Sequence, residues 1–571
     1  MYRLLTVLVM VSVAVAGTID RDLEMLIGAS ADTDHIPVFI LAYGQVDRNW
    51  VNNSTDGMSR AERQEFAVQA MQQLADASQE NILINLRAVK AENIQSLWLA
   101  NAVYCEATPA AIRQMAARSD VMLIERAAGD ISGLIEPVDV RETTPEEDSK
   151  ALAWGVEKIN ADDVWAMGYE GAGVIVGVID TGVDYNHTDL NTNMWHDTPA
   201  GLHLGYDFYD SDDDPMDDYG HGTHCCGSVA GDGTAGTETG VAPSATIMGL
   251  RINYYSGGEY TWVQAMEFGA DHGASVLSMS LGSTHGNTTL RTAEENLLTA
   301  GVYHSVAAAN SGPAPGTILS SGDSPPPWFH PDQTHHGGQS AVVTVGATDI
   351  SDNIANFSSR GPVTWWSDYS DSTPLIDPDI SGPGVDITSC RWSGYSGSGP
   401  YTVMSGTSMA TPHLAGVAAL LLSVNSNLTV AQLDSLIEVT SVDLGASGKD
   451  NTYGAGRVDA YAAAQAALGM SSAEEETEAA VEPSFVGISA ISPNPVVSHA
   501  VFTVNAVSAG FADIGVYDVT GRRAANISSD ELSAGANAFS WQIPSSMGSG
   551  IYFVRATMNG RTVSSRMTVL R

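Results

Sequence analysis

Three residues whose side chains could act together in catalysis stand beside glycines at the ends of expected elements. Asp180 closes the apolar run Val174–Ile179 and precedes Thr-Gly, which forces the chain to turn. His221 lies within Gly-His-Gly-Thr-His, and Ser408 lies within Gly-Thr-Ser-Met-Ala-Thr-Pro, where each segment is expected to enter a helix. A hydroxyl beside an imidazole that a carboxylate orients can act as an activated nucleophile. A helix start also supplies free backbone N–H groups and a positive dipole end, which favour negative charge on a substrate oxygen.

Each of these residues has an ordinary structural explanation when it is taken alone. Asp180 could be a turn aspartate, and Ser408 could be an N-cap, the commoner role of a serine at a helix start. These explanations do not account for three such residues together at glycine-flanked element ends. They also leave unexplained why Pro412 lies inside the expected helix, where proline is costly. The pattern therefore favours a catalytic site.

The three segments resemble the signatures of the subtilisin-like serine proteases, the subtilases. Their order along the chain, Asp then His then Ser, is the order of that family, and the resemblance covers essentially all of residues 151–468. It implies that Ser408 is the nucleophile, that His221 is the base that takes its proton, and that Asp180 orients the imidazole and stabilises its cation. The expected reaction is hydrolysis of peptide bonds in proteins and peptides through an acyl-enzyme, with no cofactor for catalysis.

Two further segments extend the resemblance to the binding of substrate. Asn310, in Ala-Ala-Ala-Asn-Ser-Gly, resembles the oxyanion-hole asparagine of the family, whose amide would act together with the N–H of the nucleophile. The family usually has glycine before this asparagine, whereas this chain has Ala309, which we expect to narrow the pocket wall. The segment that resembles the family's substrate-pairing strand consists of Ser280, Leu281 and Gly282.

The aspartate-rich stretch 210–218 invites comparison with a calcium loop. An EF-hand beginning at Asp210 would place Pro215 at the glycine position and His221 at the glutamate position, so that motif is rejected. We predict instead a solvated acidic loop that borders the cleft. Asp189, nine residues after Asp180, matches a calcium ligand of the family, so the resemblance implies a structural calcium ion there.

Other readings of the polar residues are less consistent with the sequence. An α/β-hydrolase requires Gly-x-Ser-x-Gly and the order Ser, Asp, His, whereas here Ala410 replaces the second glycine and the order differs. Three histidines in a proline-rich insertion are predicted to be surface residues rather than ligands: His330, His335 and His336.

Residues 151–468 alternate short apolar runs with helical segments. The runs are continuous, which suits parallel strands buried on both faces, and they cover 174–179, 245–250, 275–280, 302–307 and 342–345. Helices are expected at 261–273, 290–300 and 409–423. The pattern predicts a doubly wound α/β domain, with its functional groups beyond the carboxyl ends of the strands.

Residues 17–150 are predicted to form a small α+β unit followed by an exposed linker over 127–150. The expected strands cover 36–43, 96–104 and 121–124, and the expected helices cover 59–77 and 109–118. The unit resembles the subtilase propeptide, which chaperones folding and then inhibits the enzyme. Because residues 153–161 resemble the usual start of the mature domain, processing is expected between Ile135 and Ala153.

The two ends of the sequence carry expected export signals. Residues 1–16 have a basic start, an apolar stretch and a small-residue cleavage site, which is typical of a signal peptide cut after Ala16. An acidic linker over 469–483 precedes a predicted β-sandwich at 484–571, with strands at 500–504, 512–518, 538–541, 551–556 and 562–570. Three motifs lie in this domain: Ser-Pro-Asn-Pro at 492–495, Val-Tyr-Asp-Val-Thr-Gly-Arg at 516–522 and Ser-Gly-Ile-Tyr-Phe at 549–553. Through these motifs the sandwich resembles the sorting domain of the type IX secretion route; the alternative is a module that binds substrate or carbohydrate.

The composition sets limits on partners. The 571 residues carry a net charge of −42, which argues against nucleic acid and anionic membranes as partners. Residues 151–468 hold 36 acidic and 7 basic residues, whereas 484–571 hold 4 and 6, which marks a separate unit. No CxxC zinc pattern occurs among the four cysteines, and three of them fall within 151–468, so at least one thiol there should be free.

Together these features predict a secreted serine endopeptidase made as a self-inhibited zymogen. We expect export through the periplasm to the cell surface or medium, with the propeptide as inhibitor and the outer-membrane secretion machinery as partner of the C-terminal domain. We also expect a monomer without a membrane span once the signal is removed. The rival hypothesis is a catalytically silent, subtilase-like adhesin, and the intact set of Asp180, His221, Ser408 and Asn310 favours the enzyme.

Overall fold

The structure is a computed structural model, in which the described residues form two compact units. One unit comprises residues up to 46 together with 55–469, and the other comprises 47–54 together with 470–571. The description covers residues 17–569 with gaps at 128–131, 145–146, 148–150, 198–201, 255–257, 285, 334–337, 365–373, 397–398, 479–484, 489–490, 493–495, 508, 519–522, 545–546, 548–549 and 559–560. The expected signal segment, His335, His336 and parts of the C-terminal sorting motifs lie outside the described residues.

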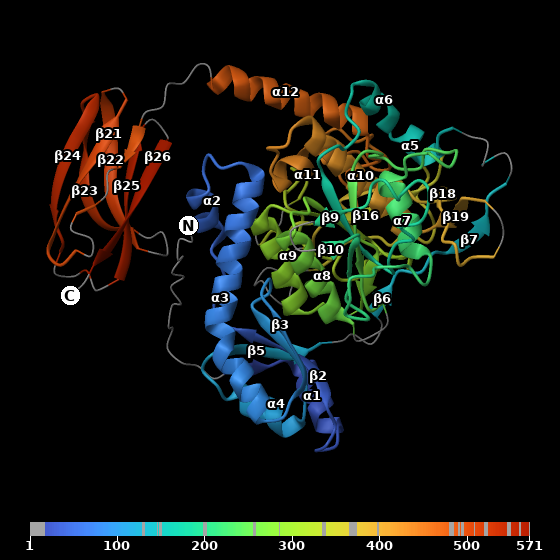
Figure 1. Ribbon diagram of the computed structural model, residues 1–571, viewed down its shortest axis with the longest axis horizontal. Coiled ribbons are helices and arrows are strands. Elements are labelled where there is room, and N and C mark those ends of the chain that lie inside the picture. The colour runs from blue at the N-terminus through green and yellow to red at the C-terminus, as the bar shows by residue number, and fades with distance from the viewer. Residues whose placement is uncertain are drawn as a thin grey trace. The chain divides into compact units, whose positions relative to one another are not determined.

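A seven-stranded parallel sheet forms the centre of the larger unit (Figure 1). The strand order is β11-β12-β8-β13-β15-β16-β17, and every neighbouring pair is parallel. These strands span Gly205–Asp207 (β11), Thr246–Arg251 (β12), Ile175–Asp180 (β8), Val276–Met279 (β13), Tyr303–Ala307 (β15), Val342–Thr348 (β16) and Ile380–Pro383 (β17). The predicted α/β class is confirmed, because the continuous apolar runs become strands that are buried on both faces.

Helices and short strands complete the domain around this sheet. The helices are α5 (Trp154–Lys158), α6 (Ala161–Ala166), α7 (His221–Ala230), α8 (Glu259–Asp271), α9 (Thr288–Ala300), α10 (Thr407–Val424), α11 (Val430–Val439) and α12 (Ala460–Glu478). The short strands are β9 (His196–Asp197), β10 (Leu202–His203), β14 (Leu281–Ser283), β18 (Ile387–Cys390) and β19 (Tyr401–Ser405). Helix α12 continues through the first ten residues of the expected acidic linker.

Helix α10 is the one helix among the described residues that is long and apolar enough to cross a membrane. It packs against α7 and against strands β13, β15, β16 and β17, and 89% of its apolar window is buried inside the protein. A helix of this composition is expected at the centre of a large α/β core, where hydrophobic residues surround it on all sides.

The N-terminal domain is a five-stranded sheet with helices packed against it (Figure 1). In chain order its elements are β1 (Thr18–Ile19), α1 (Arg21–Ala29), β2 (Ile36–Ala42), α3 (Arg60–Ala88), β3 (Glu92–Leu97), β4 (Ala102–Ala107), α4 (Pro109–Ala116) and β5 (Val121–Arg126), with strand order β1-β5-β2-β4-β3. A further short helix, α2 (Arg48–Ser54), lies between β2 and α3 in sequence.

Two elements of this domain differ from the sequence prediction. Residues 98–101 form a turn between β3 and β4, not the middle of one strand; Asn101 takes a φ of 49°, and its amide donates to the Gly44 carbonyl oxygen (2.9 Å). An asparagine tolerates this left-handed geometry. The apolar residues on both sides of it make the sequence resemble one continuous strand, so the turn was not predicted. Helix α3 continues to Ala88 rather than ending near residue 77, because Ile82 and Leu86 extend its buried face at helical spacing.

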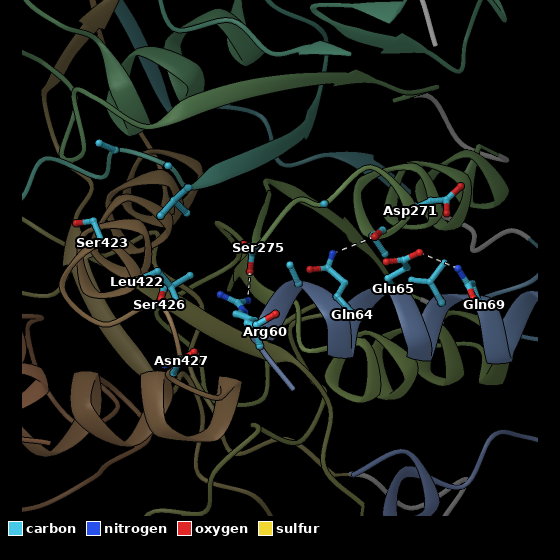
Figure 2. Close-up of a pocket in the computed structure, with 18 of the residues that line it drawn as sticks. Arg60, Gln64, Glu65, Gln69, Asp271, Ser275, Leu422, Ser423, Ser426 and Asn427 are labelled. Atoms are coloured by element: carbon cyan, nitrogen blue, oxygen red, sulfur yellow. Dashed lines mark hydrogen bonds between the residues drawn. The ribbon is translucent and has the colours of Figure 1, made fainter. Parts of the chain in front are cut away.

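The first turns of α3 lie against the domain built around the seven-stranded sheet (Figure 2). The guanidinium of Arg60 donates to the Ser275 carbonyl oxygen (2.9 Å), and the buried amide of Gln64 donates to the carbonyl oxygens of Ala270 and Ala274 (2.9 Å each). A polar cavity of about 760 Å³ remains along this contact. The long helix therefore fixes the N-terminal domain to loops at the amino ends of the central strands.

Two buried carboxylates make further contacts between these domains. Glu125 accepts hydrogen bonds from the backbone N–H groups of Thr288 (2.9 Å) and Thr289 (2.7 Å) in the first turn of α9, where the helix dipole favours a negative charge. Glu267 on α8 accepts from the Leu99 N–H (2.8 Å) in the turn between β3 and β4. Burial raises the pKa of Glu125 against the opposing effect of these hydrogen bonds, and it raises the pKa of Glu267 to about 8.

The described part of the segment after β5 is largely exposed, as the sequence predicts, but it also contains two short strands that the sequence does not predict. Residues Ser132–Leu134 (β6) pair antiparallel with β14, and Asp139–Glu142 (β7) pairs antiparallel with β19. Between these two strands, Ile135 is only 5% exposed. The polar, acidic composition of the segment does not predict these strands, because their pairing partners, β14 and β19, lie far away in the sequence.

The smaller unit consists mainly of two antiparallel sheets. One sheet contains β20 (Phe485–Ile488), β21 (His499–Ala506) and β24 (Gly535–Gln542); the other contains β22 (Gly510–Asp518), β23 (Arg523–Leu532), β25 (Gly550–Met558) and β26 (Arg561–Val569). Residues from both sheets share one hydrophobic core, which includes Phe502, Val516, Trp541 and Val554. Strands β20 and β23 add to the five that the sequence predicts.

A buried lysine anchors the last part of the larger unit. The ammonium group of Lys449, whose side chain is fully buried, donates to Asp379 (2.8 Å) and Glu438 (2.9 Å). Burial alone would lower the pKa of Lys449, but the two carboxylates raise it, so the lysine keeps its charge. Burial also raises the pKa values of the neighbouring Asp377 and Asp434, which favours their neutral forms.

We predict that Lys449→Met destabilises the protein by about 3–5 kcal/mol, because Asp379 and Glu438 would keep their desolvation cost without a counter-ion. The matched control is Lys158→Met, which breaks a partly exposed ion pair with Asp352 (2.9 Å) and should cost less than about 1 kcal/mol. Urea denaturation followed by tryptophan fluorescence measures both values. Equal losses in the two variants would contradict the anchoring role of Lys449.

Candidate functional site

Asp180 lies at the carboxyl end of β8, a central strand of the sheet, and is 1% exposed. Its Oδ1 accepts a hydrogen bond from the Thr181 N–H (2.7 Å) and lies 2.8 Å from Nδ1 of His221. Its Oδ2 is buried without a hydrogen-bond partner among the described residues. The carboxylate is therefore directed at the imidazole and shielded from water.

His221 begins helix α7 and is fully buried. With a carboxylate oxygen at Nδ1, the ring carries its proton there and leaves a lone pair on Nε2. Nε2 has no hydrogen-bond partner among the described residues. The helix can approach this closely because residue 222 is glycine; a Cβ on Gly222 would lie 2.1 Å from the carbonyl oxygen of Gly182.

The carboxylates around His221 determine its protonation. Burial by itself would lower the pKa of His221, but Asp180 raises it through both its charge and its hydrogen bond, and Asp217 and Glu136 add to this effect. The pKa therefore lies above the ordinary value of histidine. A negative field of this kind stabilises the imidazolium that forms when the ring accepts a proton.

Asp217 is a positioning residue that the sequence analysis did not identify. It was included in a predicted solvated loop, and its neighbours 212–214 and 218 are indeed exposed, but Asp217 is only 2% exposed. Its Oδ1 accepts from the Thr181 hydroxyl (2.8 Å) and its Oδ2 from the Thr223 N–H (2.8 Å). It thus ties the turn after Asp180 to the first turn of α7. Its position four residues before His221, at a helix start, was the available signal.

Ser408 lies in the first turn of α10 and is fully buried. Pro412 has no N–H to donate to the carbonyl oxygen of residue 408, one helical turn earlier. That oxygen accepts instead from the Ser280 hydroxyl (3.2 Å) and the Cys225 thiol (3.5 Å). The proline thus leaves the Ser408 carbonyl free for contacts that fix the serine to α7 and to Ser280, the residue that follows β13.

Cys225 lies on the same face of α7 as His221, as the four-residue spacing predicts. Its Sγ is 3.8 Å from Nδ1 of His221. Burial raises the pKa of this thiol well above its ordinary value, so it stays protonated and packs as a small side chain between His221 and Ser408. All four cysteines of the chain are free and buried, which confirms the expected free thiol.

The chain's own segment around Ile135 lies across these residues. The Ser408 hydroxyl is 2.7 Å from the Ile135 carbonyl oxygen, and the Ile135 N–H donates to the Ser280 carbonyl oxygen (3.1 Å). Pairing continues upstream as Leu281 with Leu134 and Gly282 with Gly133. Downstream, the Val138 N–H donates to the Ser405 carbonyl oxygen (2.7 Å). The segment therefore crosses the nucleophile position in an extended conformation.

Asn310 lies beside the same segment, after the end of β15. Its Oδ1 accepts from the backbone N–H (2.9 Å) and the hydroxyl (3.0 Å) of Thr407, which fixes the orientation of the amide. Its Nδ2 donates to the Glu136 carbonyl oxygen (2.8 Å), one residue beyond the carbonyl that Ser408 contacts. The residue before it, Ala309, has a φ of 89°, a conformation that alanine rarely adopts.

Most of the site residues selected from the sequence thus lie in one place: Asp180, His221, Ser280, Leu281, Gly282, Asn310 and Ser408. A hydroxyl next to a peptide carbonyl, an imidazole with a free ring nitrogen, a carboxylate that orients the ring and an amide donor form an arrangement suited to acyl transfer.

Asp189 lies apart from this group, and its surroundings do not fit the predicted calcium ion. Its Oδ1 accepts from the Ala235 N–H, and its Oδ2 accepts from the Tyr401 hydroxyl (2.8 Å). The ligand-type atoms near it belong to His187 and Cys390, whereas calcium takes six to eight oxygen ligands. Both carboxylate oxygens are satisfied by protein donors, so we derive no role for calcium at this position.

The chain belongs to the subtilase family: residues 171–456 match the Subtilase family of peptidases, family S8. The match includes Asp180, His221, Asn310 and Ser408 and covers half of the chain. The fold and the site together with this match define a subtilisin-like serine endopeptidase.

Three relatives illustrate the similarity. Subtilisin DY of Bacillus licheniformis is 35% identical over 320 residues, which is 56% of this chain and 100% of the relative. Thermitase of Thermoactinomyces vulgaris is 35% identical over 316 residues, or 55% of this chain and 95% of the relative. Subtilisin E of Bacillus subtilis (strain 168) is 33% identical over 322 residues, or 56% and 73%. The likeness thus covers about half of this chain.

Proposed function

We propose that this endopeptidase is made as a secreted, self-inhibited zymogen that cuts its own chain with Ser408 as the nucleophile. The observation that carries the proposal is the 2.7 Å contact between the Ser408 hydroxyl and the Ile135 carbonyl oxygen, next to a buried Asp–His pair. Protein and peptide substrates would bind in the same way, as an added strand along Ser280, Leu281 and Gly282.

In this mechanism Ser408 Oγ attacks the carbonyl carbon while Nε2 of His221 takes the hydroxyl proton. Collapse of the tetrahedral intermediate breaks the carbon–nitrogen bond, and the imidazolium gives the proton to the leaving amine. Water then attacks the acyl-enzyme by the same route and releases the acid. Asp180 holds the proton on Nδ1 throughout and stabilises the transient positive charge of the imidazolium. Because Asp180 is buried away from water, its electrostatic attraction to that charge is stronger.

Asn310 and the Ser408 N–H are the proposed donors to the oxyanion. The amide of Asn310 is already oriented by Thr407, so it has little freedom to lose when the oxyanion forms. In the uncut chain its Nδ2 lies on the Glu136 carbonyl oxygen and would move to the neighbouring oxygen as charge develops there. Loss of one such donor costs roughly 10²–10³ in turnover.

The bond we assign to self-cleavage is Ile135–Glu136. Ile135 makes the backbone contacts with Ser280 and the hydroxyl contact with Ser408. The next bond, Glu136–Pro137, would leave a secondary ring amine and lacks the N–H that the leaving side of a bound peptide offers. The assigned bond lies at the start of the interval 135–153 that the sequence predicts for processing.

We predict that purified Ser408→Ala protein stays uncut, whereas the native protein yields a new amino terminus at Glu136. Mass spectrometry of both proteins after incubation measures this. Ser435→Ala on α11, whose hydroxyl donates to the Gln432 carbonyl oxygen within the same helix (3.0 Å), is the matched control and should mature normally. Autonomous maturation of Ser408→Ala would rule out the serine mechanism. An uncut native chain without peptidase activity would support the rival, a silent adhesin.

After cleavage, the N-terminal domain is proposed to remain bound as an inhibitor until it dissociates. Glu267 has a pKa near 8 in the bound state, and Glu125 is also raised, whereas ordinary values return once each carboxylate is exposed. The bound state therefore holds more protons, and by linkage its affinity falls as pH rises from about 4.5 to 8.

We predict that retention of the cleaved N-terminal domain weakens by more than about tenfold between pH 5.5 and 8, since one pKa unit corresponds to a factor of ten. Glu267→Gln keeps an oxygen that accepts the Leu99 N–H but cannot titrate, so it should flatten most of this dependence. Size-exclusion chromatography of the matured protein across this pH range measures it. Glu157→Gln, an exposed carboxylate, is the control; an unchanged pH dependence in Glu267→Gln would contradict the assignment.

The proposed route out of the cell uses both ends of the chain. Residues 1–16 would direct export into the periplasm, and the domain at 484–571 would engage the outer-membrane secretion machinery as a sorting signal. The proteolytic site supports this division, because every residue assigned to it lies between 135 and 408 in the larger unit. The same observation supports action as a monomer.

We predict that deletion of 484–571 leaves activity on soluble peptides intact but traps the protein in the periplasm. Fractionation of a host that has the type IX route, with peptidase assays on each fraction, measures both effects. A binding module would give the opposite result: the truncated enzyme would still be secreted and would lose activity only on insoluble substrate. That second outcome would replace the sorting proposal.

A further inference from the structure

The side chain of Ile135 fills a small apolar pocket next to Ser408. It forms a buried cluster with Ala307 and Ala309, and Leu319 packs against the same cluster. Gly282 also borders this cluster, since a Cβ there would lie 3.3 Å from Cδ1 of Ile135 and 3.0 Å from a methyl group of Leu319. The cluster contains only apolar side chains, and the isoleucine is 5% exposed within it.

Ala309 limits the size of this pocket. The φ of Ala309 is 89°, a backbone conformation that favours glycine, so the alanine methyl is present although it makes this conformation less favourable. The methyl group is part of the cluster around Ile135 and is 1% exposed. A side chain larger than isoleucine would have to displace this methyl or Leu319, and overpacking of a filled site is unfavourable.

We propose that the enzyme cuts after medium-sized aliphatic residues, isoleucine, valine and leucine, and that the Ala309 methyl excludes aromatic side chains. The inference rests on the proposed function, because it assumes that external peptides bind where Ile135 lies. The side chains of this cluster carry no charge that would offset the desolvation of a lysine, arginine or glutamate side chain, so burial of such a side chain against them would be costly. Alanine would leave the space that Ile135 fills empty.

The test measures kcat/KM of the mature enzyme on peptides that differ only in the residue before the scissile bond. Isoleucine, valine and leucine should be cut at least tenfold faster than phenylalanine, lysine or glutamate. Ala309→Gly should raise kcat/KM for the phenylalanine peptide at least tenfold and change that for the isoleucine peptide much less. Glycine suits the backbone at this position, so the variant is expected to fold.

Ala308→Gly is the matched control, because it makes the same change one residue earlier, outside the cluster around Ile135, and should leave the preference unchanged. A second variant reports on the same pocket within the full chain: Ile135→Phe should slow self-cleavage at least tenfold, and Ala309→Gly should restore it. Isoleucine and phenylalanine peptides cut at equal rates would overturn the proposed preference. If the preference for isoleucine over phenylalanine is unchanged in Ala309→Gly, the Ala309 methyl does not determine it. If the native enzyme cleaves none of the peptides, the proposed function itself is contradicted.

Discussion

The hydrogen bond between Asp180 and Nδ1 of His221 is the contact on which the rest of the site depends. It fixes which ring nitrogen carries the proton, and it places a negative charge where an imidazolium would form. The bond is effective because both groups are almost completely buried, so water does not compete with it. Burial of this kind requires a strand end and a helix start in close contact, which Gly222 allows and Asp217 secures.

The N-terminal domain is connected to the site by a series of contacts along its chain. Four polar side chains fix the N-terminal domain on the helices and strand ends of the neighbouring domain: Arg60, Gln64, Glu125 and Glu267. Two short strands after β5 then pair with β14 and β19. Ile135 is brought to Ser408 by a domain that is itself fixed at several points. The position of Ile135 at Ser408 is therefore determined by contacts along the whole interface between the two domains, and not by the segment around Ile135 alone.

Local patterns predicted the central fold well, because continuous apolar runs and glycine-flanked motifs depend on neighbouring residues. The five strands and three helices predicted for residues 151–468 lie within a few residues of their observed ends. Features set by distant partners were missed. Residues 132–134 and 139–142 pair with the edges of two strands far away in the sequence, and the turn at Asn101 lies within an apolar run that resembles one strand. Asp189 matched a calcium ligand by spacing, but Tyr401, more than 200 residues away, occupies one of its oxygens.

The excess of acidic residues imposes a constraint on the interior as well as on the surface. With 7 basic residues against 36 acidic ones in residues 151–468, some cations pair with several carboxylates at once. Arg251 pairs with three aspartates, Asp207, Asp210 and Asp218, and Lys449 pairs with two buried carboxylates.

Carboxylates that have no cation are satisfied in other ways. Asp217 accepts hydrogen bonds from backbone N–H and hydroxyl groups at a helix start, whereas Asp377 and Asp434 are driven by burial toward their neutral forms. The negative charge left at the site is then concentrated at Asp180 and Asp217, where it favours an imidazolium on His221. A composition adverse to burial thus contributes directly to the electrostatics of the proposed catalytic histidine.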